Sequence, residues 1–283
     1  MPFITIRKTW YIVLVVCALP MMRGTALAAE KWVACGDDQL LFYALHNGSM
    51  RETDRLAWSD LDIPWEFSDS ARLDGMVECK PVNQGQSLLV ASWKGDVARV
   101  DLAGRKVDFS AQVPHAHSAD LLPDNRIAFV GNRLRVFDAD NGKTPLIDIP
   151  LDDGHGIRWD QEKNILYVLS EDYMEEFALE DWNTPSPKLK PTKKTGLPGK
   201  SDGHDLAVTD DGMFLVSTRD GVWIFTPESR QFAPYPELNP VYRAQSVAGS
   251  GDSVVWVQAE ESWGGRGVFV RTGSGPVQRL STP

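Results

Sequence analysis

The chain has 283 residues, of which 39 are acidic and 29 are basic, and its formal net charge is −10 at pH 7. This excess of carboxylates repels nucleic acid and anionic lipid headgroups, so both are excluded as partners. The length suffices for one large domain, and a local basic pocket could still bind an anionic small molecule.

The first 29 residues have the pattern of a secretory signal peptide. Residues 7–8 are basic, residues 10–18 are apolar, and the segment "TALAAE" contains a small-x-small cleavage pattern. The apolar run is shorter than the roughly 20 residues of a spanning helix, which argues against a membrane anchor. We therefore predict cleavage after Ala28 or Ala29, a periplasmic or secreted protein with a net charge of −13, and one domain over residues 30–283.

Two cysteines follow this leader, Cys35 and Cys79. An exported chain meets an oxidising compartment, in which a disulfide between them is possible. Their spacing does not decide between a disulfide and two small buried apolar side chains, so both alternatives stay open.

An internal repeat occupies the rest of the chain. Five marker residues each stand ten positions before an apolar residue, at steps of 39, 38, 49 and 41: Glu78, His117, His155, His204 and Gln245. The long step contains a Pro- and Lys-rich insertion over 181–200, which is typical of a surface loop. Three of the five histidines of the chain are therefore markers of this repeat.

Each unit predicts four short strands. A short strand and a tight turn follow the marker, then an apolar strand such as "ILYVLS", an alternating strand such as "GVWIFTP", and a weaker fourth strand. The stretch "WVACGDDQLLFYALHNG" (32–48) fits a sixth unit without a first strand. Four strands per period of about 40 residues indicate an all-β, six-bladed β-propeller. Alternatives are seven blades with one degenerate blade, or a two-sheet sandwich, which does not predict a constant offset.

The markers predict a polar site at one mouth of the channel, because the first strand of every blade lines it. One carboxylate and three imidazoles suit a divalent Mn, Zn, Ni or Fe ion. The predicted metal ligands are Glu78, His117, His155 and His204. The alternative is that these side chains only hydrogen-bond neighbouring blades.

Further site residues are predicted at the same mouth from the turns between the second and third strands, from His115, which stands two residues before His117, and from the marker Gln245. The candidates for proton transfer and anion binding are His115, Lys94, Arg133 and Arg219. The candidates for contacting a ligand are Trp93, Trp263, Glu261 and Gln245. For His115, a plain loop residue is the competing interpretation. Nucleotide-binding, zinc-protease and serine-hydrolase motifs are absent from the sequence.

Five motifs carry a resemblance: "ECKPV", "AHSADLLP", "GHGIRWD", "GHDLAV" and "QAEESW". Together they resemble the motif set of a family of secreted bacterial six-bladed propellers of unknown function. The resemblance implies the fold and export, and it implies a lysine where this chain has Gln245. A looser similarity of fold and site, without shared motifs, links the histidines to oligogalacturonate lyases, which are metal-dependent propellers.

Two functions follow as expectations. The first is a divalent-metal-dependent lyase or hydrolase that acts on an acidic carbohydrate, with the metal polarising a carboxylate or carbonyl. The second is a non-catalytic propeller that binds a glycan or a peptide end at the same mouth. The sequence does not decide whether the protein is an enzyme, which small molecule or glycan it binds, or its oligomeric state.

Overall fold

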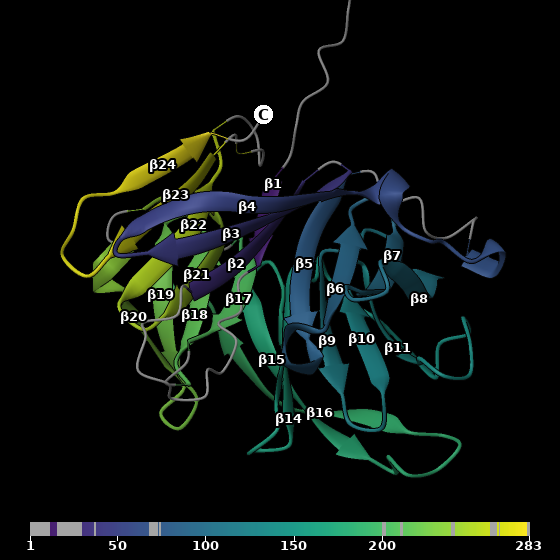
Figure 1. The fold of residues 1–283 in the computed structure, drawn as a ribbon. Coiled ribbons are helices and arrows are strands. Elements are labelled where there is room, and N and C mark those ends of the chain that lie inside the picture. The colour runs from purple at the N-terminus through teal and green to yellow at the C-terminus, as the bar shows by residue number, and fades with distance from the viewer. Residues whose placement is uncertain are drawn as a thin grey trace, which may run out of the picture.

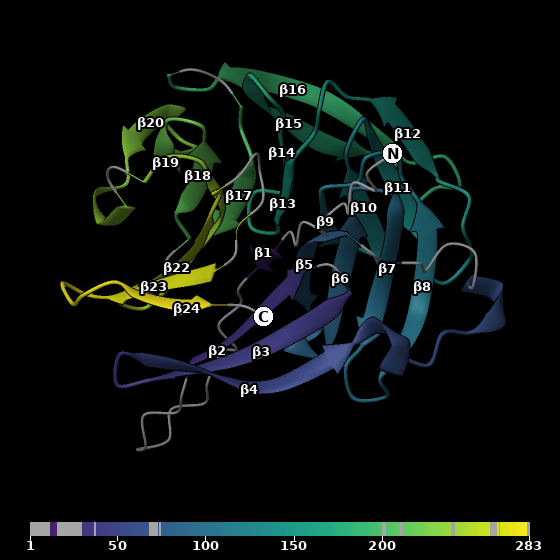
Figure 2. The ribbon, with the colours of Figure 1, turned by 90° about the horizontal axis from the view of Figure 1, so that it is seen from above.

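The computed structural model describes residues 12–15, 30–36, 38–67, 73, 75–199, 202–209, 212–238, 241–260, 265 and 267–281. Their 24 strands form six antiparallel sheets of four consecutive strands each, which confirms the predicted six-bladed propeller. Figure 2 shows the blades around a central axis, with β5, β9, β13 and β17 close to it and β4, β8, β16 and β20 at the periphery.

The first three blades run in chain order from the innermost to the outermost strand (Figure 1). Blade one contains β1 Ile12–Val15, β2 Glu30–Gly36, β3 Gln39–His46 and β4 Ser49–Ala57. Blade two contains β5 Met76–Val82, β6 Ser87–Ser92, β7 Asp96–Asp101 and β8 Lys106–Gln112. Blade three contains β9 Ser118–Leu122, β10 Arg126–Val130, β11 Arg133–Asp138 and β12 Ile147–Pro150.

The last three blades repeat this order. Blade four contains β13 Gly156–Asp160, β14 Ile165–Leu169, β15 Tyr173–Glu180 and β16 Lys188–Gly196. Blade five contains β17 Asp205–Val208, β18 Phe214–Thr218, β19 Gly221–Thr226 and β20 Gln231–Pro234. Blade six contains β21 Ala244–Ser250, β22 Ser253–Gln258, β23 Gly267–Thr272 and β24 Gln278–Ser281.

The helices in the described part of the chain are short 3-10 turns, η1 Trp58–Asp60, η2 Trp65–Phe67, η3 Asn83–Gly85 and η4 Pro236–Leu238. None of them is long and apolar enough to cross a bilayer.

The apolar cores lie between blades. Each of the six clusters of buried side chains takes its members from two neighbouring blades, and together the clusters cover all six neighbour pairs of the ring. Consecutive apolar residues on the central strands, as in β6 and β22, produce this arrangement, because successive side chains point to opposite faces and each sheet buries both faces against its neighbours. Blades one and six meet in the same way, through residues such as Trp32 and Val257, and their described strands remain in separate sheets.

The insertion over 181–200 is not a plain surface loop, and this prediction is wrong. Residues Lys188–Gly196 form β16, the outermost strand of blade four, which pairs with β15. Its composition reflects an edge position, because lysines and a proline, here Pro191 at a β-bulge, are typical of strands with one unpaired edge.

Blade one does have an innermost strand. β1 pairs with β2 in antiparallel register, with Ile12 opposite Gly36 and Val15 opposite Val33. This strand comes from within the predicted leader, whereas the predicted cleavage region lies outside the described residues. Cleavage after Ala28 or Ala29 would therefore remove the inner strand of blade one, and the leader itself stays a prediction.

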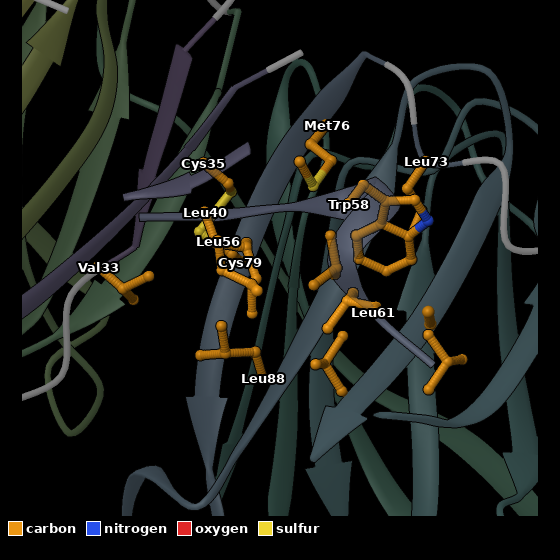
Figure 3. Packing of buried hydrophobic residues seen from close by; sticks show 14 residues of the cluster. Val33, Cys35, Leu40, Leu56, Trp58, Leu61, Leu73, Met76, Cys79 and Leu88 are labelled. Atoms are coloured by element: carbon orange, nitrogen blue, oxygen red, sulfur yellow. A yellow bond between two sulfur atoms is a disulfide. The ribbon is translucent and has the colours of Figure 1, made fainter. Parts of the chain in front are cut away.

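A disulfide joins blades one and two. Cys35 on β2 and Cys79 on β5 are bonded, with their Cα atoms 5.9 Å apart. Of the two alternatives for these cysteines, the structure has the disulfide and not two free buried thiols. Both residues are completely buried in the cluster between these blades, together with Leu40, Leu88 and Trp58 (Figure 3). The bridge therefore links two sheets inside an apolar core.

Candidate functional site

The chain enters four inner strands through the same three-residue turn. The first residue of each turn has a positive φ, between 51° and 77°, although none is glycine. The turns are His115-Ala116-His117, Asp153-Gly154-His155, Asp202-Gly203-His204 and Arg243-Ala244-Gln245. Left-handed conformations at non-glycine residues are uncommon and cluster at functional sites. Their recurrence in four consecutive blades marks the entrance of the channel as a specialised region.

The middle residue of each turn is small because the neighbouring blade leaves no room for a larger one. Ala116 and Ala244 are completely buried. A Cβ on Gly154 would lie 2.9 Å from the carbonyl oxygen of Gly131, and one on Gly203 would lie 2.7 Å from that of Ser170. The first and third residues then present their side chains at the mouth.

Three histidines from consecutive blades lie against one another at this mouth. The ring centroids of His117 and His155 are 4.2 Å apart, and those of His155 and His204 are 4.8 Å apart. His115 lies beside them, 6.2 Å from His117. The structure thus brings together all four histidines that the sequence predicted for the site.

Backbone carbonyl groups fix the tautomers of two of these rings. Nδ1 of His155 lies 3.1 Å from the carbonyl oxygen of Asp153, and Nδ1 of His204 lies 3.0 Å from that of Gln245. A carbonyl oxygen only accepts hydrogen bonds, so Nδ1 must carry the proton in both rings. Nε2 then keeps its lone pair, which is the arrangement found where histidine binds a metal.

The environment keeps two of the rings neutral. Loss of water around the ring lowers the pKa of His117 well below its usual value, and the neighbouring His155 and His204 lower it further. The same desolvation, together with His155 and Arg243, lowers the pKa of His204 to about 3, against a smaller upward effect of its bond to Gln245. Neutral imidazole is the form that coordinates a metal ion, so the cluster is prepared for one at pH 7.

A carboxylate that the sequence did not single out completes a candidate metal cluster. One potential ligand atom from each of His117, Asp153 and His155 lies within 4.8 Å of the others. Asp153 reaches the mouth because it is the left-handed first residue of its turn. The repeated "DGH" at 153–155 and 202–204 was the available signal, since it places a carboxylate two residues before each histidine.

Glu78 lies apart from this cluster, and the structure gives its carboxylate a different role. Its Oε2 accepts the backbone N–H of Ala119 in the next blade at 2.9 Å, and its Oε1 lies 3.3 Å from Nζ of Lys80. Asp205 makes the equivalent bond to the N–H of Val247 at 2.8 Å. Burial raises the pKa of Glu78 to about 7 and that of Asp205 to about 6. These two carboxylates join inner strands of neighbouring blades.

The sequence alignment was one residue out of register in blade two. Glu78 pairs with Ala91 on the second strand, as Asp205 pairs with Ser217, so Glu78 corresponds to Asp205 and not to His204. Glu78 stands 13 positions before its partner and Asp205 stands 12 before its own, so the shift comes from a turn between the two strands that is one residue longer in blade two. Glu78 therefore makes the hydrogen bond to a neighbouring blade that was the alternative to a metal ligand.

The two predicted anion-binding arginines already contact carboxylates. Nε of Arg219 donates to Asp202 at 2.9 Å, and Arg133 binds Asp148. Arg135 shares Asp148 at 3.2 Å. The structure therefore places both predicted arginines in ion pairs within the protein.

The remaining predicted residues lie around the rim or outside the description. Trp93 is 40% exposed, and Nζ of Lys94 lies 5.8 Å from the centre of its ring. Gln245 is buried, and no described residue forms a hydrogen bond with its Oε1. Glu261 and Trp263 lie outside the described residues. Gln245 thus offers a buried acceptor beside the histidines.

Sequence reasoning missed two further residues of the rim, Tyr242 and Arg243. Tyr242 is 56% exposed, and Arg243 lies close enough to His204 to lower its pKa. Arg243 is the left-handed residue of the blade-six turn, equivalent to Asp153. It could have been found from its position two residues before Gln245.

Comparison with known proteins adds little beyond the fold. No protein-family profile and no curated protein sequence matches the chain. Among solved structures, the fold is similar to a catalytically inactive virginiamycin B lyase from Staphylococcus aureus crystallised with quinupristin. The two chains share 14% identity, and the likeness covers 74% of this chain and 70% of the lyase with a TM-score of 0.49. A likeness of this size carries no functional argument.

Proposed function

We propose that the histidine-lined mouth binds a divalent transition metal and acts as a lyase or hydrolase site for an acidic carbohydrate. The observation that carries the proposal is the cluster of His117, Asp153 and His155, whose potential ligand atoms lie within 4.8 Å of one another. Two imidazole nitrogens and one carboxylate suit Mn, Zn, Ni or Fe. His204 lies next to the cluster, and Oε1 of Gln245, which has no hydrogen-bond partner among the described residues, is a further potential ligand atom.

The residues around the cluster support the proposed chemistry. A bound metal would polarise a carboxylate or carbonyl of the substrate. His115 is exposed beside His117 and lies outside the cluster, so it is the candidate to accept or donate a proton. The exposed indole of Trp93 offers a flat apolar face for a sugar ring.

Metal content tests the first half of the proposal. The protein is stripped with a chelator, loaded separately with Mn, Zn, Ni and Fe, and analysed for bound metal. We expect one ion per chain in the wild type and a loss of most binding in His155→Ala and Asp153→Asn. His46→Ala, an exposed turn residue of blade one, is the matched control and should bind as the wild type does. Equal metal content in all four proteins would contradict the site.

A panel of acidic oligosaccharides tests the second half. A lyase creates a carbon–carbon double bond that absorbs in the ultraviolet, and a hydrolase creates a reducing end without one. His115→Ala should lower the rate while metal content stays unchanged. Saturable binding without either product would support the non-catalytic glycan-binding function instead, and the absence of binding would remove the carbohydrate from the proposal.

A further inference from the structure

The opposite mouth of the channel contains a cavity of about 740 Å³. It is formed by the turns that follow the inner strands of blades two, four and five and by β9 of blade three. An inner strand separates it from the histidines, since Asp160 is five residues beyond His155, or roughly 16 Å along an extended strand. Its volume lies in the range of about 300–1,000 Å³ that is typical of small-molecule sites. It is therefore a space distinct from the proposed metal site.

Arg158 on β13 lines this cavity, and among the described residues its guanidinium forms only one long ion pair. Its side chain is 31% exposed, and its nearest acidic neighbour is Asp120, whose Oδ2 lies 3.8 Å from a guanidinium nitrogen. Within the described residues, the guanidinium makes no hydrogen bond. Each oxygen of Asp120 already accepts one backbone N–H, from Leu121 at 2.9 Å and from Trp159 at 2.7 Å, so its charge is shared with these bonds and is not directed at Arg158 alone. Arg158 thus presents donors to the cavity, in the planar arrangement that suits a carboxylate.

The other charges of the cavity restrict what Arg158 can bind. Lys163 is engaged, with Nζ 2.9 Å from Glu228 and 3.5 Å from Asp160. Glu162 is exposed on the same turn and lines the cavity with Asp160. Acidic side chains therefore outnumber basic ones around Arg158. A phosphate dianion would be repelled by them, whereas a ligand with one carboxylate and one cationic group would be complementary to both kinds of charge.

We propose that this cavity binds a zwitterion of the amino-acid or short-peptide class. The carboxylate of the ligand contacts the guanidinium of Arg158, and its ammonium group lies toward Asp160 and Glu162. The amides of Asn83 and Gln161 line the same cavity and can bond to a peptide group. The site does not depend on the metal proposal, because it uses none of the same residues.

Calorimetric titration with alanylalanine, its C-terminal amide and its N-acetyl derivative tests the site. We expect the dipeptide to bind, the amide to bind at least tenfold more weakly because Arg158 loses its partner, and the acetylated form to lose the contact with the acidic side chains. Arg158→Gln should abolish the preference for the free carboxylate, and Arg158→Lys should restore only part of it, since lysine lacks the planar fork. Each variant is first checked for an unchanged melting temperature.

Two controls separate this site from its alternatives. Arg135→Gln removes an arginine on β11 that pairs with Asp148, and it should bind the dipeptide as the wild type does. His155→Ala should also leave dipeptide binding unchanged. Tighter binding of inorganic phosphate than of the dipeptide would overturn the zwitterion, as would equal binding of acid and amide. No binding of the dipeptide below about 10 mM would overturn the site.

Discussion

Reduction of the Cys35–Cys79 disulfide should destabilise the protein strongly. The bridge closes a loop with a sequence separation of 44 residues. In the chain-entropy description, a loop of this length restricts the unfolded chain by about 4 kcal/mol at 25 °C. Both sulfurs are buried in a core that the two blades share, so reduction also leaves two thiols in an apolar interior. We expect the free energy of unfolding to fall by about 2–4 kcal/mol.

Urea unfolding of the oxidised and the reduced protein, followed by tryptophan fluorescence, measures this difference. Cys35→Ala/Cys79→Ala is the matched variant, and its stability should not change when reductant is added. A midpoint that is the same with and without reductant in the wild type would refute the reasoning. So would mass spectrometry that finds two free thiols in the non-reduced protein.

Three further predictions concern the channel. Burial raises the pKa of Glu78 to about 7, above its value of 4.5 in an unfolded chain. The folded wild type therefore binds this proton more tightly, and its free energy of unfolding should rise by up to about 3 kcal/mol as the pH falls from 7 to 4.5. The urea midpoint of Glu78→Gln should rise less between pH 8 and pH 5 than that of the wild type. An equal rise in both proteins would show that Glu78 is not the origin of the pH dependence. His204 has the opposite sign: its lowered pKa means that stability is lost as the pH falls below about 6.5, and His204→Asn should lose less. Gly203→Ala should lower the free energy of unfolding by about 1–3 kcal/mol in thermal melts, because the new Cβ meets the carbonyl oxygen of Ser170. Gly196→Ala is the control, since a Cβ there meets no atom within 4 Å and should leave the stability unchanged. Equal effects of the two substitutions would exclude the steric explanation.

The repeat was readable from the sequence because strands and turns have local signals. Apolar runs such as residues 165–169 and 214–218 appear as predicted, and the marker histidines do begin the inner strands. β16 was missed because its lysines and proline resemble those of a loop, and only its pairing with β15 makes it a strand. β1 was missed because the same apolar residues also fit a leader.

The composition of the site was harder to predict than its place. A constant offset cannot detect a turn that is one residue longer, so Glu78 was assigned to the wrong position of the repeat. Asp153 and Arg243 reach the mouth through left-handed backbone, whereas strand alternation describes extended backbone only. The ion pairs of Arg133 and Arg219 join residues 15 and 17 positions apart, and a sequence does not show which cations are already paired.

The absence of strand exchange between the described parts of blades one and six has a consequence for synthesis. Every sheet is made of consecutive strands, so each blade can complete its own hydrogen bonds soon after it is made. Blade one nevertheless carries an apolar face, with Trp32 and Tyr43, that in the described structure packs against blade-six residues such as Val255, about 220 residues later. At ribosomal speeds of about 5–20 residues per second, this face stays exposed for roughly 10–40 s before blade six is synthesised. During that interval the nascent chain exposes a hydrophobic surface around Trp32. A chaperone that binds exposed aromatic strands would bind this surface first.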